Sequence, residues 1–252
     1  MIGVFRSGLM SNPVTLSLNE FRALLRKAFE GLYAHDQDWN ALADLVLWLE
    51  FHGLSGLDIF LGTASSLPGP APMSYRDDEQ ILIDGNGASL LTFNNRACDL
   101  LLADANMMGQ SQLRAINVKH PDIIAASVAR CAEEGFASVA WWIDESGTAR
   151  VVFQKALDKA PKLYKIQNGV KHVHDNEITI MASKYITDIE GSSPDWVDFN
   201  EDNVLENQIS NQYDEFLDHG FSLSGADYRQ LCQLADKVLV EATEKSRQGA
   251  GE

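Results

Sequence analysis

The sequence predicts a mixed α/β or α+β fold, in which an N-terminal helical segment packs on a central mixed sheet with flanking helices. Three observations predict this class. Apolar residues recur at helical spacing near both ends of the chain. Runs with strand character alternate with helical stretches only in the middle, which excludes a continuous βαβ array. The 252 residues are 45% hydrophobic, which is enough for a substantial core.

Residues 1–62 are predicted to form a helical subdomain. Ser17–Glu20 reads as a capping box, and apolar residues follow it at helical spacing. Either Asp36 or Asp38 caps a second helix, and Gly53 is the expected left-handed residue at its end. The three expected helices are 18–32, 39–52 and 57–61.

Residues 63–78 contain three prolines and are predicted to be a linker or an extended strap. Residues 79–252 are predicted to form an α/β core with a C-terminal helix. Gly85–Gly87 favours a hairpin turn over a phosphate cradle, and Pro121 fits the first turn of a helix. The expected strands are 80–84, 88–93, 113–118, 137–143, 149–153 and 177–183, and the expected helices are 94–108, 121–134, 202–217 and 224–239.

The charge balance excludes some partners. The chain has 20 Lys and Arg against 36 Asp and Glu, a net charge of −16, so nucleic acid and anionic membrane surfaces are not expected partners. No apolar run reaches the length of a membrane span, and the N-terminus lacks the pattern of a signal peptide. Cys98, Cys131 and Cys232 are widely spaced without a C-x-x-C motif. We therefore expect a reduced cytoplasmic protein, with a redox or nucleophilic cysteine as the alternative.

The run from Asn117 to His120 ends a predicted strand and precedes a predicted helix. Ligands of α/β proteins usually bind at such strand ends. There His120 would act as an acid or base, with Asn117 as a hydrogen-bond donor. Lys119 would hold an anion together with the start of the helix. The alternative is a solvent-facing connector with ordinary capping.

His172 and His174 form the run that most resembles a metal site. On a strand their imidazoles would point to the same face, and Glu177 or Asp188 would have to supply a third ligand. The alternative is a polar turn or edge strand, and we expect no metal cofactor.

Two stretches resemble a known family. The runs SLNEFRALLRKAF and DWNALADLVLWLEFHGLSG, followed by ILIDGNG, LRAINVKH and AASVARCAEEGFASVAW, are similar in order and spacing to the malate/L-lactate dehydrogenase family. The resemblance covers residues 15–142. It implies that family's fold, an NAD(P) cofactor, a small organic ligand and a homodimer. The two ends of the chain also resemble an uncharacterised bacterial family, domain of unknown function 3726, which has no known activity.

The chain departs from the dehydrogenase pattern at its reactive positions. The family carries a His and, four residues later, an Arg in a segment SHG-x-x-R; the stretch taken as equivalent, Leu54–Ile59, has neither. Ser55 lies in that stretch and is a candidate ligand-binding residue. In the second motif Asn117 and His120 are kept, but Pro121–Asp122 replaces an aromatic residue and Gly.

These departures favour a degenerate relative without hydride transfer, which binds a small molecule or a protein partner. Hydride transfer needs cofactor, proton donor and carboxylate anchor together. The alternative is an active oxidoreductase, or another small-molecule enzyme, with a site rebuilt around His120. A third hypothesis is an interaction subunit without a small-molecule site.

Overall fold

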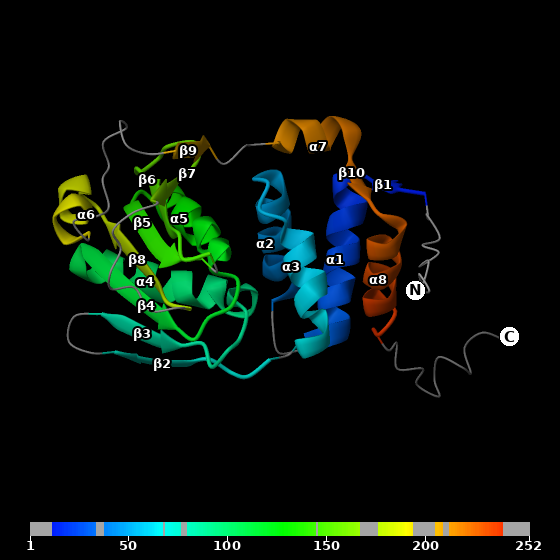
Figure 1. Cartoon of the computed structure of the whole chain (residues 1–252), viewed down its shortest axis with the longest axis horizontal. Coiled ribbons are helices and arrows are strands. Elements are labelled where there is room, and N and C mark those ends of the chain that lie inside the picture. Colours follow the sequence, from blue (N-terminus) through cyan, green and yellow to red (C-terminus); the bar gives the residue numbers. More distant parts are fainter. Residues whose placement is uncertain are drawn as a thin grey trace, which may run out of the picture. The chain divides into compact units, whose positions relative to one another are not determined.

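The computed structural model confirms the mixed class, with helices and a central mixed sheet (Figure 1). The chain forms two compact units, which divide after Asp44 and after Gln212. Among the described helices, none combines the length and apolar character needed to cross a membrane. The structure describes residues 12–33, 38–67, 69–76, 80–144, 146–166, 176–193, 205–208 and 212–238.

The first unit joins the two ends of the chain. Its elements are β1 (Val14–Leu16), α1 (Leu18–Tyr33), α7 (Tyr213–His219), β10 (Phe221–Leu223) and α8 (Gly225–Ala235), and β1 pairs antiparallel with β10.

Sequence signals at the helix starts in this unit are confirmed. The Ser17 amide donates to Glu20 Oε2 at 2.9 Å, as a capping box requires. Ser224 Oγ caps α8 by accepting from the Asp227 amide at 3.1 Å.

Helix α8, which the sequence assigns to the α/β core, packs along α1 instead. The backbones approach closely at Gly31, where a Cβ atom would lie 2.4 Å from the Leu234 carbonyl oxygen. Phe21 and Phe221 meet beside them, with ring centroids 4.6 Å apart. The domain boundaries expected after residues 62 and 78 remain predictions.

Helix α2 (Trp39–Phe51) begins in the first unit and ends in the second, where α3 (Gly56–Thr63) follows. Asp38 caps α2, because its Oδ1 accepts from the Asn40 amide at 3.0 Å. The end of α2 also holds the start of α3, since Glu50 Oε1 accepts from the Leu57 amide at 2.7 Å.

The second unit contains an eight-stranded sheet in the order β2-β3-β4-β8-β5-β6-β7-β9. Strands β3 and β4 are parallel, and β5 runs in the same direction because both β4 and β5 pair antiparallel with β8. Three carboxyl ends therefore share one edge of the sheet. The strands are β2 (Met73–Arg76), β3 (Ile81–Asp84), β4 (Gln110–Ile116), β5 (Ala137–Ile143), β6 (Ala149–Gln154), β7 (Lys162–Ile166), β8 (Ile178–Ser183) and β9 (Leu205–Gln208).

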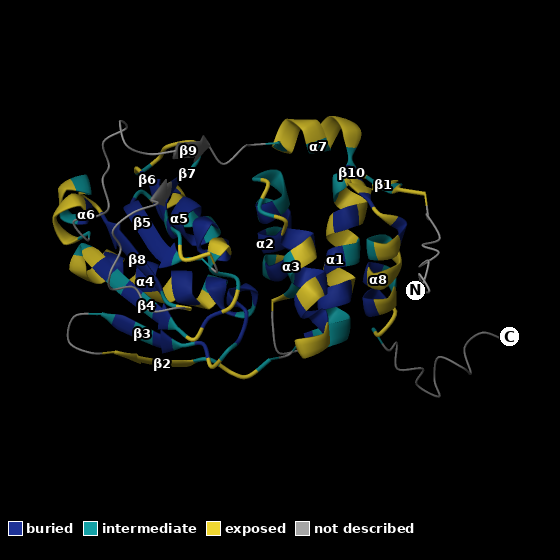
Figure 2. Cartoon of the chain, viewed as in Figure 1, coloured by how far each residue is buried: buried dark blue, intermediate teal, exposed yellow. Residues whose placement is uncertain are grey.

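Helices cover both faces of this sheet. Helices α4 (Asn94–Met108) and α5 (Ile124–Glu133) pack on one face. Helix α6 (Ile186–Ser192) packs on the other, against the cluster that contains Trp141. Trp142 points to the opposite face by strand alternation, and both rings are buried. Figure 2 shows the central strands β5 and β8 in the colour of buried residues and the edge strand β2 in that of exposed ones.

The hairpin expected around Gly85–Gly87 is wrong. Residues 88–93 form no strand but a 3₁₀ turn, η2 (Leu90–Thr92), that leads into α4. Ser89 Oγ caps this turn by accepting from the Leu91 amide at 3.2 Å. The apolar residues indicated a strand because they are buried, and burial alone does not separate a strand from a turn.

The edge strands were also missed. The expected linker 63–78 contains β2, which pairs antiparallel with β3. The polar helix expected at 202–217 is wrong, because 205–208 pairs with β7 and a helix begins only at Tyr213. Such strands lack strong hydrophobic alternation, so only their pairing partners identify them.

Candidate functional site

The candidate site lies at the shared carboxyl edge of β3, β4 and β5. Asp84 is the last residue of β3, Asn117 follows β4, and Asp144 follows β5. Polar side chains thus follow three buried strands at one edge of the sheet. Open α/β sheets bind ligands at this edge.

Asn117 is oriented by Asp84. Its Nδ2 donates to Asp84 Oδ1 at 3.0 Å, and the Asn86 amide donates to the same oxygen at 2.8 Å. The hydrogen bond from Asn117 lowers the pKa of the Asp84 carboxyl group. Asn117 has a φ of 55°, a left-handed conformation that Asn tolerates well. The amide is therefore exposed and pre-positioned.

Gly85 lets the β3 turn lie directly against the end of β4. Its amide donates to the Ile116 carbonyl at 2.8 Å, and a Cβ atom here would lie 3.0 Å from the Asn117 carbonyl oxygen. The turn thus needs Gly85 for close approach and not for a phosphate.

His120 is held by Ser89. Its Nδ1 lies 2.9 Å from Ser89 Oγ, and Ser89 and Lys119 form a parallel β-bridge. His120 also has a left-handed φ of 57°, directly before the turn that leads into α5. The residue is half-buried.

Asp122 stands beside His120. Its outer side reaches solvent, but the surrounding protein desolvates the carboxyl group and raises its pKa. The Arg150 guanidinium and the His120 ring oppose that rise. Asp122 is therefore close enough to both His120 and Arg150 to interact with their charges.

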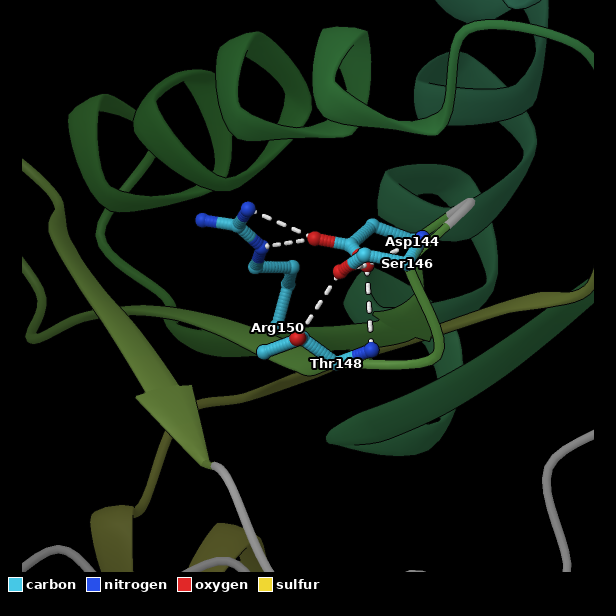
Figure 3. Close-up of polar contacts among 4 residues, drawn as sticks. All are labelled: Asp144, Ser146, Thr148 and Arg150. Carbon is cyan, nitrogen blue, oxygen red and sulfur yellow. Dashed lines mark hydrogen bonds and ion pairs between the residues drawn. The ribbon is translucent and has the colours of Figure 1, made fainter.

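Asp144 organises the turn between β5 and β6 (Figure 3). Its Oδ1 accepts from the Thr148 amide at 3.0 Å and from Ser146 Oγ at 2.5 Å, and its Oδ2 accepts from Arg150 Nε at 2.7 Å. Although partial burial acts in the other direction, these hydrogen bonds lower the pKa of Asp144 to about 2. Arg150 is thus charge-paired at the edge of the site.

The remaining predicted residues are placed as follows. The Lys119 side chain is exposed beside Asn117 and His120. Ser55 is exposed on the loop between α2 and α3, with a left-handed φ of 50° and no capping hydrogen bond from its side chain. His172 and His174 lie outside the described residues, and in the described part no group of three His, Cys, Asp or Glu could hold a metal ion.

His52 was not singled out by the sequence reasoning. Its Nδ1 donates to the Trp48 carbonyl at 2.6 Å, and its ring stacks on Trp48 with centroids 4.0 Å apart. Burial lowers its pKa, opposed by that hydrogen bond and by Glu133. With its proton on Nδ1, the neutral ring presents Nε2 as an acceptor. The sequence does carry a signal for this residue, since the pair His52-Gly53 directly follows α2.

The end of α2 offers a second placement of the family motif. Helix α2 ends at Phe51, and the pair His52-Gly53 follows it directly; matched to the His-Gly of SHG-x-x-R, this pair would place the motif three residues earlier than the stretch chosen from sequence. The motif's Arg position then falls on Gly56. A Cβ atom at Gly56 would lie 2.5 Å from the Val46 carbonyl oxygen and 2.8 Å from Leu49 Cβ. The backbone there leaves no space for a side chain.

A separate groove lies between β2 and α4, with a volume of about 360 Å³. Arg76 Nη1 donates to Asp104 Oδ1 at 2.5 Å on its wall, and Ser111 Oγ donates to Asp104 Oδ2 at 2.7 Å. The groove contains none of the candidate site residues.

Comparison with known proteins shows likeness in structure only. No protein-family model matches the chain. No curated protein matches it either. A putative malate/lactate dehydrogenase from E. coli superposes with a TM-score of 0.61 at 13% identity, covering 94% of this chain and 100% of the other.

Two further solved structures agree. Malate dehydrogenase from Pyrococcus horikoshii OT3 gives a TM-score of 0.60 at 12% identity over 92% of this chain and 97% of that one. Delta1-piperideine-2-carboxylate reductase from Pseudomonas syringae pvar. tomato gives 0.59 at 12% identity over 88% and 99%. The fold is therefore of the malate/lactate dehydrogenase type, and the likeness extends beyond residues 15–142.

Proposed function

We propose that this chain is a degenerate relative of the malate/L-lactate-type dehydrogenases that binds a small uncharged polar molecule without hydride transfer. One observation supports the proposal: when the motif's His is matched to His52, the carboxylate-binding Arg falls at Gly56, where a Cβ atom would lie 2.5 Å from the Val46 carbonyl oxygen. Without that Arg a 2-oxoacid loses its bidentate partner.

Charge at the carboxyl edge supports an uncharged ligand. Arg150 is paired with Asp144, and Arg114 forms a bidentate pair with Glu177 at 2.6 and 2.8 Å. Lys119 supplies positive charge, whereas hydrogen bonds hold the pKa of both Asp84 and Asp144 low. Hydrogen-bonding groups such as the Asn117 amide and the His120 ring would make the contacts.

The described residues at this edge do not fit the diphosphate of NAD(P). A diphosphate needs cations or a glycine-rich cradle, and the edge carries ionised carboxylates with paired arginines. The proposed function therefore involves no nicotinamide cofactor, although the family resemblance implies one.

A thermal-shift screen tests the proposal. The probes are small amides and polyols, pyruvate and oxaloacetate, and NADH and NADPH. We expect an uncharged probe to raise the melting temperature. The increase should be lost in Asn117→Gly and kept in Ser65→Ala, at an exposed serine of the 3₁₀ turn that follows α3. Oxidation of NADH or NADPH by a 2-oxoacid, abolished in His120→Ala, would refute it.

The alternative is an enzyme with a site rebuilt around His120, and the 2.9 Å contact with Ser89 Oγ favours it. An oriented imidazole beside Asp122 has the elements of acid/base catalysis. A bell-shaped pH dependence of turnover that disappears in His120→Gln would select this alternative.

We also propose a cytoplasmic homodimer, as the family resemblance implies. Light scattering coupled to size-exclusion chromatography tests the dimer, and a monomeric mass at micromolar concentration would contradict it.

A further inference from the structure

Two buried cysteines meet between α4 and α5. Cys98 lies in the second turn of α4 and Cys131 in the last turn of α5, with exposed fractions of 2% and 0%. The two thiols interact, since each shifts the pKa of the other. Cys98 Sγ also donates to the Ser127 carbonyl at 3.8 Å, and Ser127 lies one helical turn before Cys131. Both sulfur atoms therefore occupy the same helix–helix contact.

Flanking contacts hold the two helices in this register. Ser127 Oγ donates to Asn94 Oδ1 at 2.8 Å in the buried layer. Arg130 Nη2 donates to Asp99 Oδ1 at 2.6 Å at the surface. Arg130 and Asp99 are the immediate neighbours of the two cysteines, so a solvent-exposed ion pair lies beside the thiols.

The two thiols differ in acidity. The hydrogen bond from Cys131 lowers the pKa of Cys98; burial opposes this change, and the Arg130 charge assists it. The same contact and burial raise the pKa of Cys131 well above its ordinary value. Cys98 is therefore the more acidic thiol of the pair, which favours it as the attacking sulfur.

We propose that Cys98 and Cys131 form an oxidisable pair that hydrogen peroxide closes into a disulfide between α4 and α5. The Cys98 thiolate attacks one oxygen of hydrogen peroxide and the O–O bond breaks. Cys98 becomes a sulfenic acid, and the second oxygen leaves as hydroxide, which takes one proton from the solvent to become water. The Cys131 sulfur then attacks the Cys98 sulfur, and the sulfenic oxygen leaves as a second water. Overall, two thiols and one peroxide give one disulfide and two waters.

The position of the two cysteines relates the disulfide to the candidate site. Helix α4 follows the turn that carries Ser89, and α5 follows the turn that begins at His120. The disulfide would therefore join the two helices that follow the candidate site. The proposal does not depend on the function of that site, because its readout is the state of the thiols.

The test uses the full chain with Cys232→Ser as the background, since Cys232 lies on α8 in the other unit. After peroxide treatment and alkylation under denaturing conditions, we expect both remaining thiols to be lost, with a mass decrease of two hydrogens. Digestion should yield a dithiothreitol-sensitive peptide that links Cys98 to Cys131. Cys98→Ser should slow the peroxide oxidation of Cys131 about tenfold or more, because the thiolate is removed.

Two results would overturn the proposal. One is over-oxidation of Cys98 without a cross-link, and the other is full retention of both thiols under conditions that oxidise the urea-unfolded chain. If the serine variant fails to fold, as judged by circular dichroism, peptide mapping of the oxidised background protein still decides the question.

Discussion

His120 Nδ1 lies 2.9 Å from Ser89 Oγ, although 31 positions separate the two residues in the chain. Their backbones are joined as well, because the Lys119 amide donates to the Ala88 carbonyl at 3.0 Å and the Leu90 amide donates to the Lys119 carbonyl at 2.9 Å. The turn after β3 thus fixes the histidine that follows β4.

Replacing Ser89 should loosen both turns. Ser89→Ala removes the contact with His120 and the cap on the Leu91 amide, so we expect the free energy of unfolding to fall by about 1–2 kcal/mol. Urea denaturation measures this change. Ser65→Ala, at an exposed serine, is the control and should change stability by less than about 0.5 kcal/mol.

Two variants of Asn117 separate its backbone from its amide. At a φ of 55°, Asn117→Ala should cost about 1 kcal/mol of stability, whereas Asn117→Gly should stay near wild type. Both should lose ligand-induced stabilisation, because neither can donate from Nδ2. Retention of that stabilisation in Asn117→Gly would remove the amide from the site.

Two glycines of α3 should respond oppositely to alanine. Gly56→Ala places a Cβ atom 2.5 Å from the Val46 carbonyl oxygen and should destabilise the protein by about 1–3 kcal/mol. Gly62→Ala meets nothing within 4 Å and should stabilise it by about 0.5–1 kcal/mol. Equal effects of the two in thermal denaturation would show that position 56 has room for a side chain.

The lowered pKa of Asp144 predicts that the folded protein loses stability in acid. Its pKa is lowered from 3.8 to about 2 in the folded chain, so the carboxylate contributes stability above pH ~4. That contribution is lost as the pH falls from about 4 towards 2, and it amounts to about 1–2 kcal/mol after allowance for solvent screening. Asp144→Asn should therefore be less stable than wild type at pH 6, with the difference vanishing near pH 2.

Urea titrations across this pH range measure the effect. Asp218→Asn, at an exposed position on α7, provides the control and should follow the wild-type curve. A constant gap between wild type and Asp144→Asn at every pH would show that the Arg150 pair does not carry the effect.

The family resemblance leaves two placements of one motif open. In the sequence alone, the stretch Leu54–Ile59 is matched to SHG-x-x-R because it follows a predicted helix. Matching the motif's His to His52, directly after the end of α2, instead starts the motif at Phe51 and puts its Arg position at Gly56. Helix ends are set by the last satisfied backbone hydrogen bond, and short motifs do not fix them.

Local patterns indicated helices α1, α2, α4 and α5 and the buried strands β3, β5 and β8. The capping box at Ser17, the Asp38 cap and the strand 137–143 depend on residues close together in sequence, and the structure has each of them. Tertiary structure decided which segments pair: the edge strands, the packing of α8 on α1 and the meeting of Ser89 with His120. Capping and periodicity act over a few residues, whereas pairing depends on contacts between distant segments that share one core.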